Sequence, residues 1–509
     1  MSGYGLRGGP RGSGQTYTWA LVFVAILTVA AILRWELLGV RSLWYDEGYS
    51  LSVARLGWRG ILEFLRQNDA HPAGYYLLLS FWVDRFGDSL LAARFPSFGL
   101  GLGVVVLTWA LAREVYSEKA AALAALLVAV HPFQVMASNE MRMYPLLTVL
   151  VLSAVLCTLR VRRGEPWHAV LLGVLWAGVG YTSYYGLLAL AAMGTWLAVR
   201  GNGRAAATAG AVFALLYAPW VPYLAGFWRV NPQLWTREAL WWGYPVELLA
   251  AQGFGGYWPG TFTYHTSFRL PAVQYVPLLA PYLLFGAAAM RAGEEPEEAD
   301  AGLGLLAWTW AVVHVGVLAV SAVLGWVAAY PRHLVFVQPL AACLVGVGVV
   351  RASRLLAFSP AVVVGLASLW LLTLQAPAVA AMQSDPRYQT YRYDRAAQFV
   401  RAGYRPGDAV LYVPDGTSLA FEYYFRPPGR RLEVRVEPRA YRAEEWGQLF
   451  RHSVRELGTE DHRVWVVTTS PAPPAGEAAL RSVLRDRGYE LVAERVFPGL
   501  RVVLAVRRR

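Results

Sequence analysis

The sequence predicts a mainly α-helical protein that crosses a membrane many times and ends in a small α/β domain. Of its 509 residues, 56% are hydrophobic and 16% are charged, whereas soluble globular proteins carry about 25% charged residues. The charge is also unevenly distributed, because residues 385–509 hold 38 of the 80 charged side chains. We therefore expect a cytoplasmic tail at residues 1–17, a membrane domain at residues 18–380 and a soluble extracytoplasmic domain at residues 385–509.

Eleven apolar runs approach the roughly 20 residues with which a helix crosses a bilayer. They cover residues 18–38, 90–111, 120–137, 146–159, 167–182, 184–199, 205–224, 273–290, 303–326, 333–350 and 355–374. The first run should remain as an anchor, since the polar Arg34 and Glu36 stand at its end in place of a small-residue cleavage site. Residues 73–86 carry Asp84 and Arg85, which favours a helix lying in the membrane interface.

Arginine-rich loops indicate the orientation of the chain. The loops at residues 160–163, 200–204 and 351–354 fall on the same side as the basic N-terminal tail, and the positive-inside rule places that side in the cytoplasm. The opposite face receives the C-terminal domain and the outer loops 39–71, 132–143, 181–185, 227–270 and 330–332. Loop arginines also explain the net charge of +12, so we expect membrane lipids and no nucleic acid as partners.

Two adjacent carboxylates, Asp46 and Glu47, lie among aromatic residues in the first outer loop. Charged groups are costly to desolvate at a membrane surface and are often functional there. The alternatives are an exposed loop pair or the start of a helix over the amphipathic residues 48–66. Further along, His71 precedes Pro72 and could bind a metal ion or phosphate, or form an ordinary interfacial turn.

Two later outer segments combine basic and acidic groups. Glu140, Arg142 and Tyr144 occupy alternate positions before an apolar run, and Arg332 and His333 precede another. A guanidinium suits phosphate because it donates two hydrogen bonds at once. A Glu–Arg pair within the membrane is the alternative for the first segment, and snorkelling to lipid headgroups is the alternative for the second.

Aromatic residues crowd the long outer loop at residues 227–270. They could stack on sugar rings or form an interfacial aromatic belt, and the candidate substrate contacts among them are Trp241, Trp242, Tyr257 and Trp258. After this loop, the C-terminal domain shows a helical pattern at residues 391–402 and strand patterns at residues 409–413, 432–436, 464–468 and 502–506. Acceptor binding and a structural cap are both open roles for this domain.

The order of these motifs resembles the protein O-mannosyltransferase type of GT-C glycosyltransferases. The closest likeness is to the bacterial, family 39-like branch that includes lipid A sugar transferases. The resemblance covers about residues 18–355, and residues up to about 200 carry the motifs. The chain has Ala73 where His-Pro-Pro is usual in the family, and no MIR domain is recognisable. The acceptor is therefore open among lipid, glycan and protein.

The resemblance implies a polyprenyl-phosphate sugar as donor, inversion at the anomeric carbon, and a location in the bacterial inner membrane. Asp46 matches the catalytic aspartate and would act as base, with Glu47 supporting it. A divalent cation (Mg, Mn or Zn) would be held by Glu47, His71 and Glu140. The carrier phosphate would be bound by Arg142, Arg332, His333 and Tyr144. No nucleotide cofactor is expected, because the sequence contains neither of the glycine-rich phosphate-binding patterns.

A lipid or solute transporter is the main alternative from another class. It would predict internal repeats and broken spans in matched halves, whereas the polar motifs of this chain gather on one face. A membrane scaffold is a third possibility, and it would leave Asp46, Glu47 and Arg142 without a role.

Overall fold

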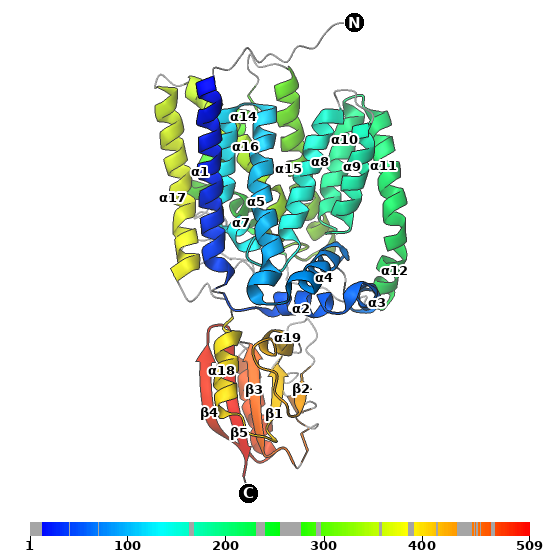
Figure 1. Cartoon of the computed structure of the whole chain (residues 1–509), viewed down its shortest axis with the longest axis vertical. Helices are drawn as coiled ribbons and strands as arrows, with labels where there is room; N and C mark the ends of the chain where they lie inside the picture. The colour runs from blue at the N-terminus through cyan, green and yellow to red at the C-terminus, as the bar shows by residue number, and fades with distance from the viewer. Residues whose placement is uncertain are drawn as a thin grey trace.

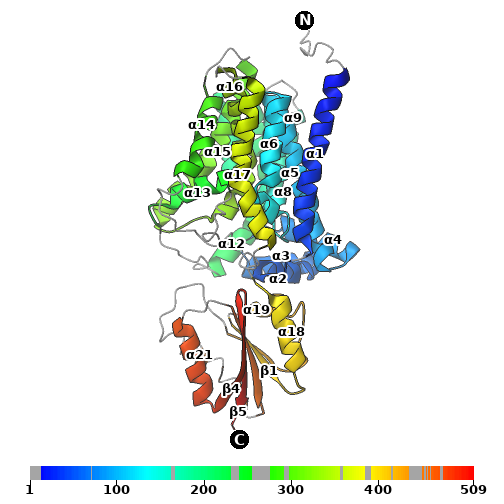
Figure 2. The ribbon, with the colours of Figure 1, turned by 90° about the vertical axis from the view of Figure 1, so that its left-hand side faces the viewer.

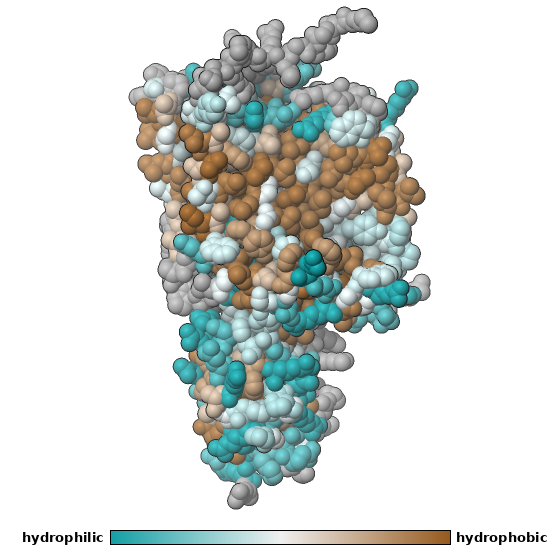
Figure 3. All heavy atoms as spheres, viewed as in Figure 1, coloured by the Kyte–Doolittle hydropathy of each residue, from teal (hydrophilic) through white to brown (hydrophobic). Residues whose placement is uncertain are grey.

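The computed structural model describes residues 13–39, 41–69, 71–161, 167–230, 240–254, 276–291, 297–355, 359–384, 391–413, 416–434, 450–451, 454, 457–458, 460–469 and 474–508. Figure 1 shows an upright bundle of helices above a smaller domain that contains the sheet, with the two termini at opposite ends of the molecule. On the face shown in Figure 3, an apolar band covers the bundle, whereas the surface of the smaller domain is more polar. This distribution is the one expected of a membrane protein with a water-soluble domain.

Long apolar helices form the bundle. Within the described residues, seven helices are long and apolar enough to cross a bilayer, and three shorter apolar helices accompany them. The bundle helices are α1 (Ser13–Leu38), α5 (Leu90–Val115), α6 (Glu118–Val130), α8 (Tyr144–Val161), α9 (Trp167–Gly180), α10 (Gly186–Val199), α11 (Gly203–Tyr217), α12 (Val221–Val230), α14 (Val276–Ala289), α15 (Glu297–Leu324), α16 (Gln338–Leu355) and α17 (Pro360–Ser384). Ten of the eleven predicted runs fall on these helices other than α6, with α11 and α12 together matching the run at residues 205–224.

The eleventh run, residues 120–137, is not one continuous helix. It divides at His131 into α6 and the short α7 (Pro132–Ala137), with Pro132 at the first position of α7. Proline lacks a backbone donor and is tolerated at the start of a helix, so the break falls where the sequence places the proline. Arg34 of α1 donates hydrogen bonds to the carbonyl oxygens of Val128 and Ala129 at the end of α6, where the last carbonyls of a helix lack their usual i+4 donors.

Three short helices lie at the end of the bundle that faces the smaller domain (Figures 1 and 2). They are α2 (Tyr45–Ala54), α3 (Gly57–Asn68) and α4 (Gly74–Phe86). Helix α4 matches the predicted interfacial run at residues 73–86. Two elements on the same side complete this end: α13 (Tyr244–Phe254) and the 3-10 helix η3 (Pro331–Val337).

The C-terminal domain contains a five-stranded mixed sheet of order β2-β1-β3-β5-β4. Strand β1 pairs in parallel with β2 and β3, and β5 pairs antiparallel with β3 and β4. Its elements are α18 (Tyr393–Gly403), β1 (Ala409–Val413), α19 (Thr417–Phe421), β2 (Arg431–Glu433), β3 (Arg463–Thr469), α21 (Pro474–Asp486), β4 (Tyr489–Phe497) and β5 (Leu500–Arg507). The four predicted strands and the helix near residue 391 are confirmed.

Helix α21 and strand β4 were not predicted from the sequence. Strand β4 is at the edge of the sheet and carries several charged residues, a common feature of edge strands. Its exposed residues also include the apolar Val492 and Val496, so polar and apolar residues do not alternate in the way by which a strand is recognised.

The two domains share one hydrophobic core. A continuous cluster of buried side chains includes Leu51 and Met141 at the end of the bundle and Tyr412 and Phe421 of the C-terminal domain. The sheet domain is therefore packed directly against helix α2, which carries Asp46, and against the segment between α7 and α8, which carries Arg142.

Candidate active site

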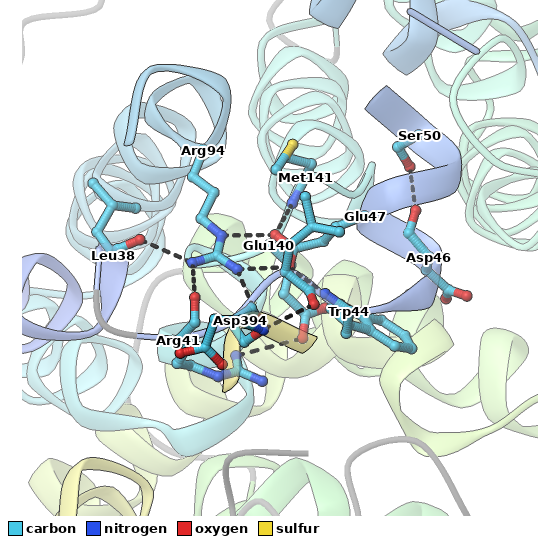
Figure 4. A network of polar contacts seen from close by, with 12 residues as sticks. Leu38, Arg41, Trp44, Asp46, Glu47, Ser50, Arg94, Glu140, Met141 and Asp394 are labelled. Carbon is cyan, nitrogen blue, oxygen red and sulfur yellow. Dashed lines mark hydrogen bonds and ion pairs between the residues drawn. The ribbon is translucent and has the colours of Figure 1, made fainter. Parts of the chain in front are cut away.

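Helix α2 places the two adjacent carboxylates in its first turn. It begins at Tyr45 after the N-cap Trp44, with Asp46 and Glu47 as its acidic residues. Backbone N–H groups are unpaired at this end of a helix, and the helix dipole favours negative charge there. Of the alternatives for this pair, the structure shows a helix start, although the N-cap is Trp44 and the amphipathic residues divide into α2 and α3. In Figure 4 the two side chains point in different directions, Glu47 toward Arg94 and Asp46 away from it.

Glu47 belongs to a buried ion pair with Arg94 of α5. The guanidinium Nε and Nη2 lie 2.7 and 2.6 Å from the two carboxylate oxygens of Glu47, and both side chains are fully buried. The backbone N–H of Met141 also donates to Glu47, at 3.2 Å. Removing one partner of such a pair leaves a buried charge unpaired, which typically costs about 3–5 kcal/mol.

Arg94 also organises the loop that leads into α2. Its Nη1 donates to the carbonyl oxygens of Leu38 and Arg41, at 2.9 Å each, and its Nη2 donates to that of Ser42. Sequence reasoning missed this residue because it lies inside a predicted span. The available signal was a single arginine within an apolar run, which is costly unless it has a specific role.

Asp46 faces a row of polar side chains. We use the term polar row for Asp46, Arg142, His71, Asp69 and Tyr76. The Nε atom of Arg142 lies 3.9 Å from an oxygen of Asp46, and its Nη2 lies 3.2 Å from Nε2 of His71. The side chain of Asp46 is 21% exposed and that of His71 is 40% exposed. A ligand can therefore reach the row at both residues.

Asp69 and Tyr76, at the end of the polar row away from Asp46, fix the orientation of the His71 ring. Nδ1 of His71 lies 2.7 Å from Asp69, and the Tyr76 hydroxyl donates to the other Asp69 oxygen at 2.7 Å. Burial raises the pKa of Asp69, but His71 and Tyr76 outweigh it, and the pKa lies below the ordinary value. Asp69 is therefore an anion at neutral pH, and it turns Nε2 of His71 toward Arg142.

Glu140 lies close enough to Asp46 and Glu47 for their charges to act on it. Its side chain is fully buried, 3.6 Å from Nη1 of Arg41. Burial, together with the charges of Glu47 and Asp46, raises its pKa to about 8 against the opposing charge of Arg41. Its surroundings thus favour the neutral form of the carboxyl.

The second basic segment, Arg332 and His333, starts η3 on the same side of the bundle. His333 accepts a hydrogen bond from the Tyr330 N–H at 3.1 Å, and its ring stacks on Tyr185 and Tyr144 at centroid distances of 4.8 and 6.3 Å. The charge of Arg332 lowers the pKa of Glu140. The structure thus brings Arg332, His333 and Tyr144 to the side of the bundle that holds Glu140 and Arg142.

The candidate aromatic contacts separate into two groups. Trp241 packs against the core of the bundle, whereas Trp242 is 76% exposed; their ring centroids are 6.2 Å apart. Tyr257 and Trp258 lie outside the described residues. Of the described pair, Trp242 offers the larger exposed surface to a ligand.

The three side chains predicted to bind a divalent cation, Glu47, His71 and Glu140, are not grouped as metal ligands. Among the described residues, no three His, Cys, Asp or Glu side chains are grouped so that they could hold an ion. Glu47 is bound on both oxygens by Arg94, and Glu140 faces Arg41. The predicted set of Glu47, His71 and Glu140 therefore does not form a binding site for a divalent cation in this arrangement.

Comparison with known proteins identifies the fold class. Residues 70–223 match the family model described as dolichyl-phosphate-mannose-protein mannosyltransferase. Two solved structures of ArnT from Cupriavidus metallidurans share the fold. The apo structure has a TM-score of 0.60 and 16% identity, covering 96% of this chain and 98% of ArnT. The structure bound to undecaprenyl phosphate has a TM-score of 0.58 and 14% identity, covering 97% and 98%.

A third neighbour is the oligosaccharyltransferase AglB from Archaeoglobus fulgidus in complex with an inhibitory peptide and a dolichol-phosphate. Its TM-score is 0.53 at 13% identity, with 94% of this chain and 74% of AglB covered. No curated protein sequence matches the chain significantly. The fold is the GT-C fold of ArnT with a small C-terminal sheet domain, and the resemblance stated from the sequence is confirmed.

Proposed function

We propose that this chain is a membrane glycosyltransferase that moves a sugar from a polyprenyl-phosphate donor to an acceptor hydroxyl of a lipid, glycan or protein. The observation that carries the proposal is the partly exposed Asp46 carboxylate beside Arg142 and His71. A base and a phosphate-binding cation are the two groups that such a transfer requires. The shared fold supports the donor class, because ArnT has been solved with undecaprenyl phosphate and AglB with a dolichol-phosphate.

The reaction we propose is an inverting displacement. The acceptor oxygen attacks the anomeric carbon while its proton passes to Asp46. The bond between that carbon and the phosphate oxygen breaks, and its electron pair leaves with the polyprenyl phosphate. Attack from the face opposite the leaving group inverts the configuration. Asp46 suits the role of base because its carboxylate accepts no side-chain hydrogen bond from the described residues and lies beyond hydrogen-bonding distance from Arg142.

Cationic groups would stabilise the departing phosphate. Arg142 is held from two sides, by Ser50 at 3.3 Å and by His71 at 3.2 Å, so its guanidinium is preorganised for an anion. Arg332, His333 and Tyr144 would complete the phosphate site. Glu47 would support Asp46 through the structure of α2, since its own oxygens are bound by Arg94.

The proposed location is the bacterial inner membrane, with the N-terminus in the cytoplasm and the active site outside. Cysteine substitutions at exposed positions test this on intact spheroplasts. Val492→Cys in the C-terminal domain should react with an impermeant thiol reagent, and Val199→Cys at the end of α10 should not; both side chains are exposed. The native Cys157 and Cys343 are buried. Labelling at Val199 alone would reverse the orientation.

The activity is tested with purified protein in vesicles and a panel of labelled polyprenyl-phosphate hexoses and pentoses. Release of polyprenyl phosphate measures turnover whichever acceptor is used. We expect release from at least one donor when an envelope lipid extract is supplied as acceptor, and no release from the Asp46→Asn variant. Movement of the label across the vesicle membrane without cleavage would favour a transporter instead.

A further inference from the structure

Helix α2 contains a glycine, Gly48, at a position where helix geometry does not require one. Gly48 is an interior position of α2, two residues after Asp46, and glycine in a helix interior is less favourable than alanine. A Cβ at Gly48 would lie 2.8 Å from the backbone nitrogen of Ala420 and 2.9 Å from the carbonyl carbon of Leu419. Both atoms belong to the backbone of α19 and cannot rotate away. The absence of a side chain at Gly48 is what lets α19 of the C-terminal domain rest on α2.

Further contacts join the C-terminal domain to the segment just before α2. The backbone N–H of Leu43 donates to the Tyr424 hydroxyl at 2.7 Å, and the backbone N–H of Asp394 donates to the Ser42 hydroxyl at 3.3 Å. The carbonyl of Ser42 is held from the bundle by Arg94. Residues 42–43 are therefore fixed between the two domains, immediately before the turn that carries Asp46.

We propose that the C-terminal domain is a positioning element of the active site: α19, seated on Gly48, and Tyr424, bonded to Leu43, fix α2 and thereby the Asp46 carboxylate. This rests on the proposed function, in which Asp46 is the base. A simple cap would cover the site without concentrating its contacts on α2 and the residues before it. A base displaced by about 1 Å can lose on the order of 100-fold in rate, so these contacts matter for turnover.

Gly48→Ala tests the proposal, with Gly99→Ala as the matched control. Gly99 also lies inside a helix, α5, but a Cβ there would meet nothing within 4 Å. Helix propensity alone favours alanine at both positions. We expect Gly48→Ala to lower kcat by about 10- to 100-fold with unchanged affinity for undecaprenyl phosphate. Gly99→Ala should keep parental kcat.

Hydrogen exchange separates positioning from a general loss of structure and does not depend on activity. Gly48→Ala should speed exchange in both α2 and α19 while β4 and α21 keep parental rates. A Gly48→Ala variant with parental kcat, or with slow exchange in α19, would overturn the proposal. If that variant fails to fold, Tyr424→Phe provides a second test, because it removes the acceptor of the Leu43 N–H. We expect a several-fold lower kcat with unchanged undecaprenyl phosphate affinity, and parental kcat would again overturn the proposal.

A parent protein that cleaves no donor would remove the proposed function, while the exchange result would still show whether the C-terminal domain is docked on α2.

Discussion

Two neighbouring residues of α2 form acid–arginine pairs of opposite character. Glu47 and Arg94 are both fully buried and meet through two hydrogen bonds of 2.7 and 2.6 Å. Asp46 and Arg142 stand 3.9 Å apart, and Asp46 is partly exposed. The first pair satisfies its own charges, which is the requirement for a buried ion pair. The second leaves the carboxylate and the guanidinium able to bind other groups, as a reacting site requires.

Removing the charge at Asp46 should give the largest effect on turnover. Asp46→Asn keeps the size of the side chain but removes its proton affinity, and loss of a general base typically costs roughly 100- to 10,000-fold in rate. Expression, thermal stability and undecaprenyl phosphate affinity should stay near parental values. An Asp46→Asn protein with parental kcat would mean that Asp46 is not the reactive carboxylate.

Breaking the buried pair should instead act on stability. Glu47→Gln leaves Arg94 as a buried charge without its anion, and we expect a loss of about 3–5 kcal/mol in the free energy of unfolding, measured by thermal unfolding in detergent. Added Mg²⁺ or Mn²⁺ should not restore activity, because the Glu47 oxygens bind Arg94. Rescue by either cation would show that Glu47 is a metal ligand after all.

Arg142→Lys tests whether Arg142, which pairs with the partly exposed Asp46, binds the carrier phosphate. Lysine keeps the charge but loses the planar fork, and it also loses the contacts that Arg142 makes with Ser50 and His71. We expect weaker binding of undecaprenyl phosphate by about 1–3 kcal/mol, measured by titration of the purified protein. Equal affinity in parent and variant would reduce Arg142 to a structural charge.

Asp69→Asn should have the smallest effect and is recognisable by its pH dependence. The folded-state pKa of Asp69 is depressed, so its contribution to stability is present above the ordinary carboxyl pKa and is lost as the pH falls through the folded value. We expect the variant to be about 1 kcal/mol less stable at pH 7. The difference should disappear in acid, as followed by thermal unfolding at several pH values. A difference independent of pH would mean that the Asp69 charge is not what holds His71.

Hydropathy predicted most of the fold. The apolar runs, the interfacial run at residues 73–86 and four of the five strands were readable because each pattern is contained in a short stretch of sequence. The division of residues 120–137 at His131 could have been read from Pro132. Strand β4 could not, since its exposed residues include the apolar Val492 and Val496 and its pairing shifts register between Leu491 and Ala493, so polar and apolar residues do not alternate along it.

The sequence by itself determined the membrane class, the order of the polar motifs and the choice of Asp46, His71 and Arg142 as candidate residues. The resemblance to a known family already gave Asp46 the role of base and Glu47 a supporting role, but only the tertiary structure showed the surroundings of the two carboxylates. Adjacent residues of a helix point about 100° apart, so the two carboxylates had to meet different surroundings. The partner of Glu47, however, is 47 residues away in α5, and the backbone that requires Gly48 lies in the C-terminal domain. Such partners are set by how helices from distant parts of the chain pack together, and no local pattern of sequence encodes them.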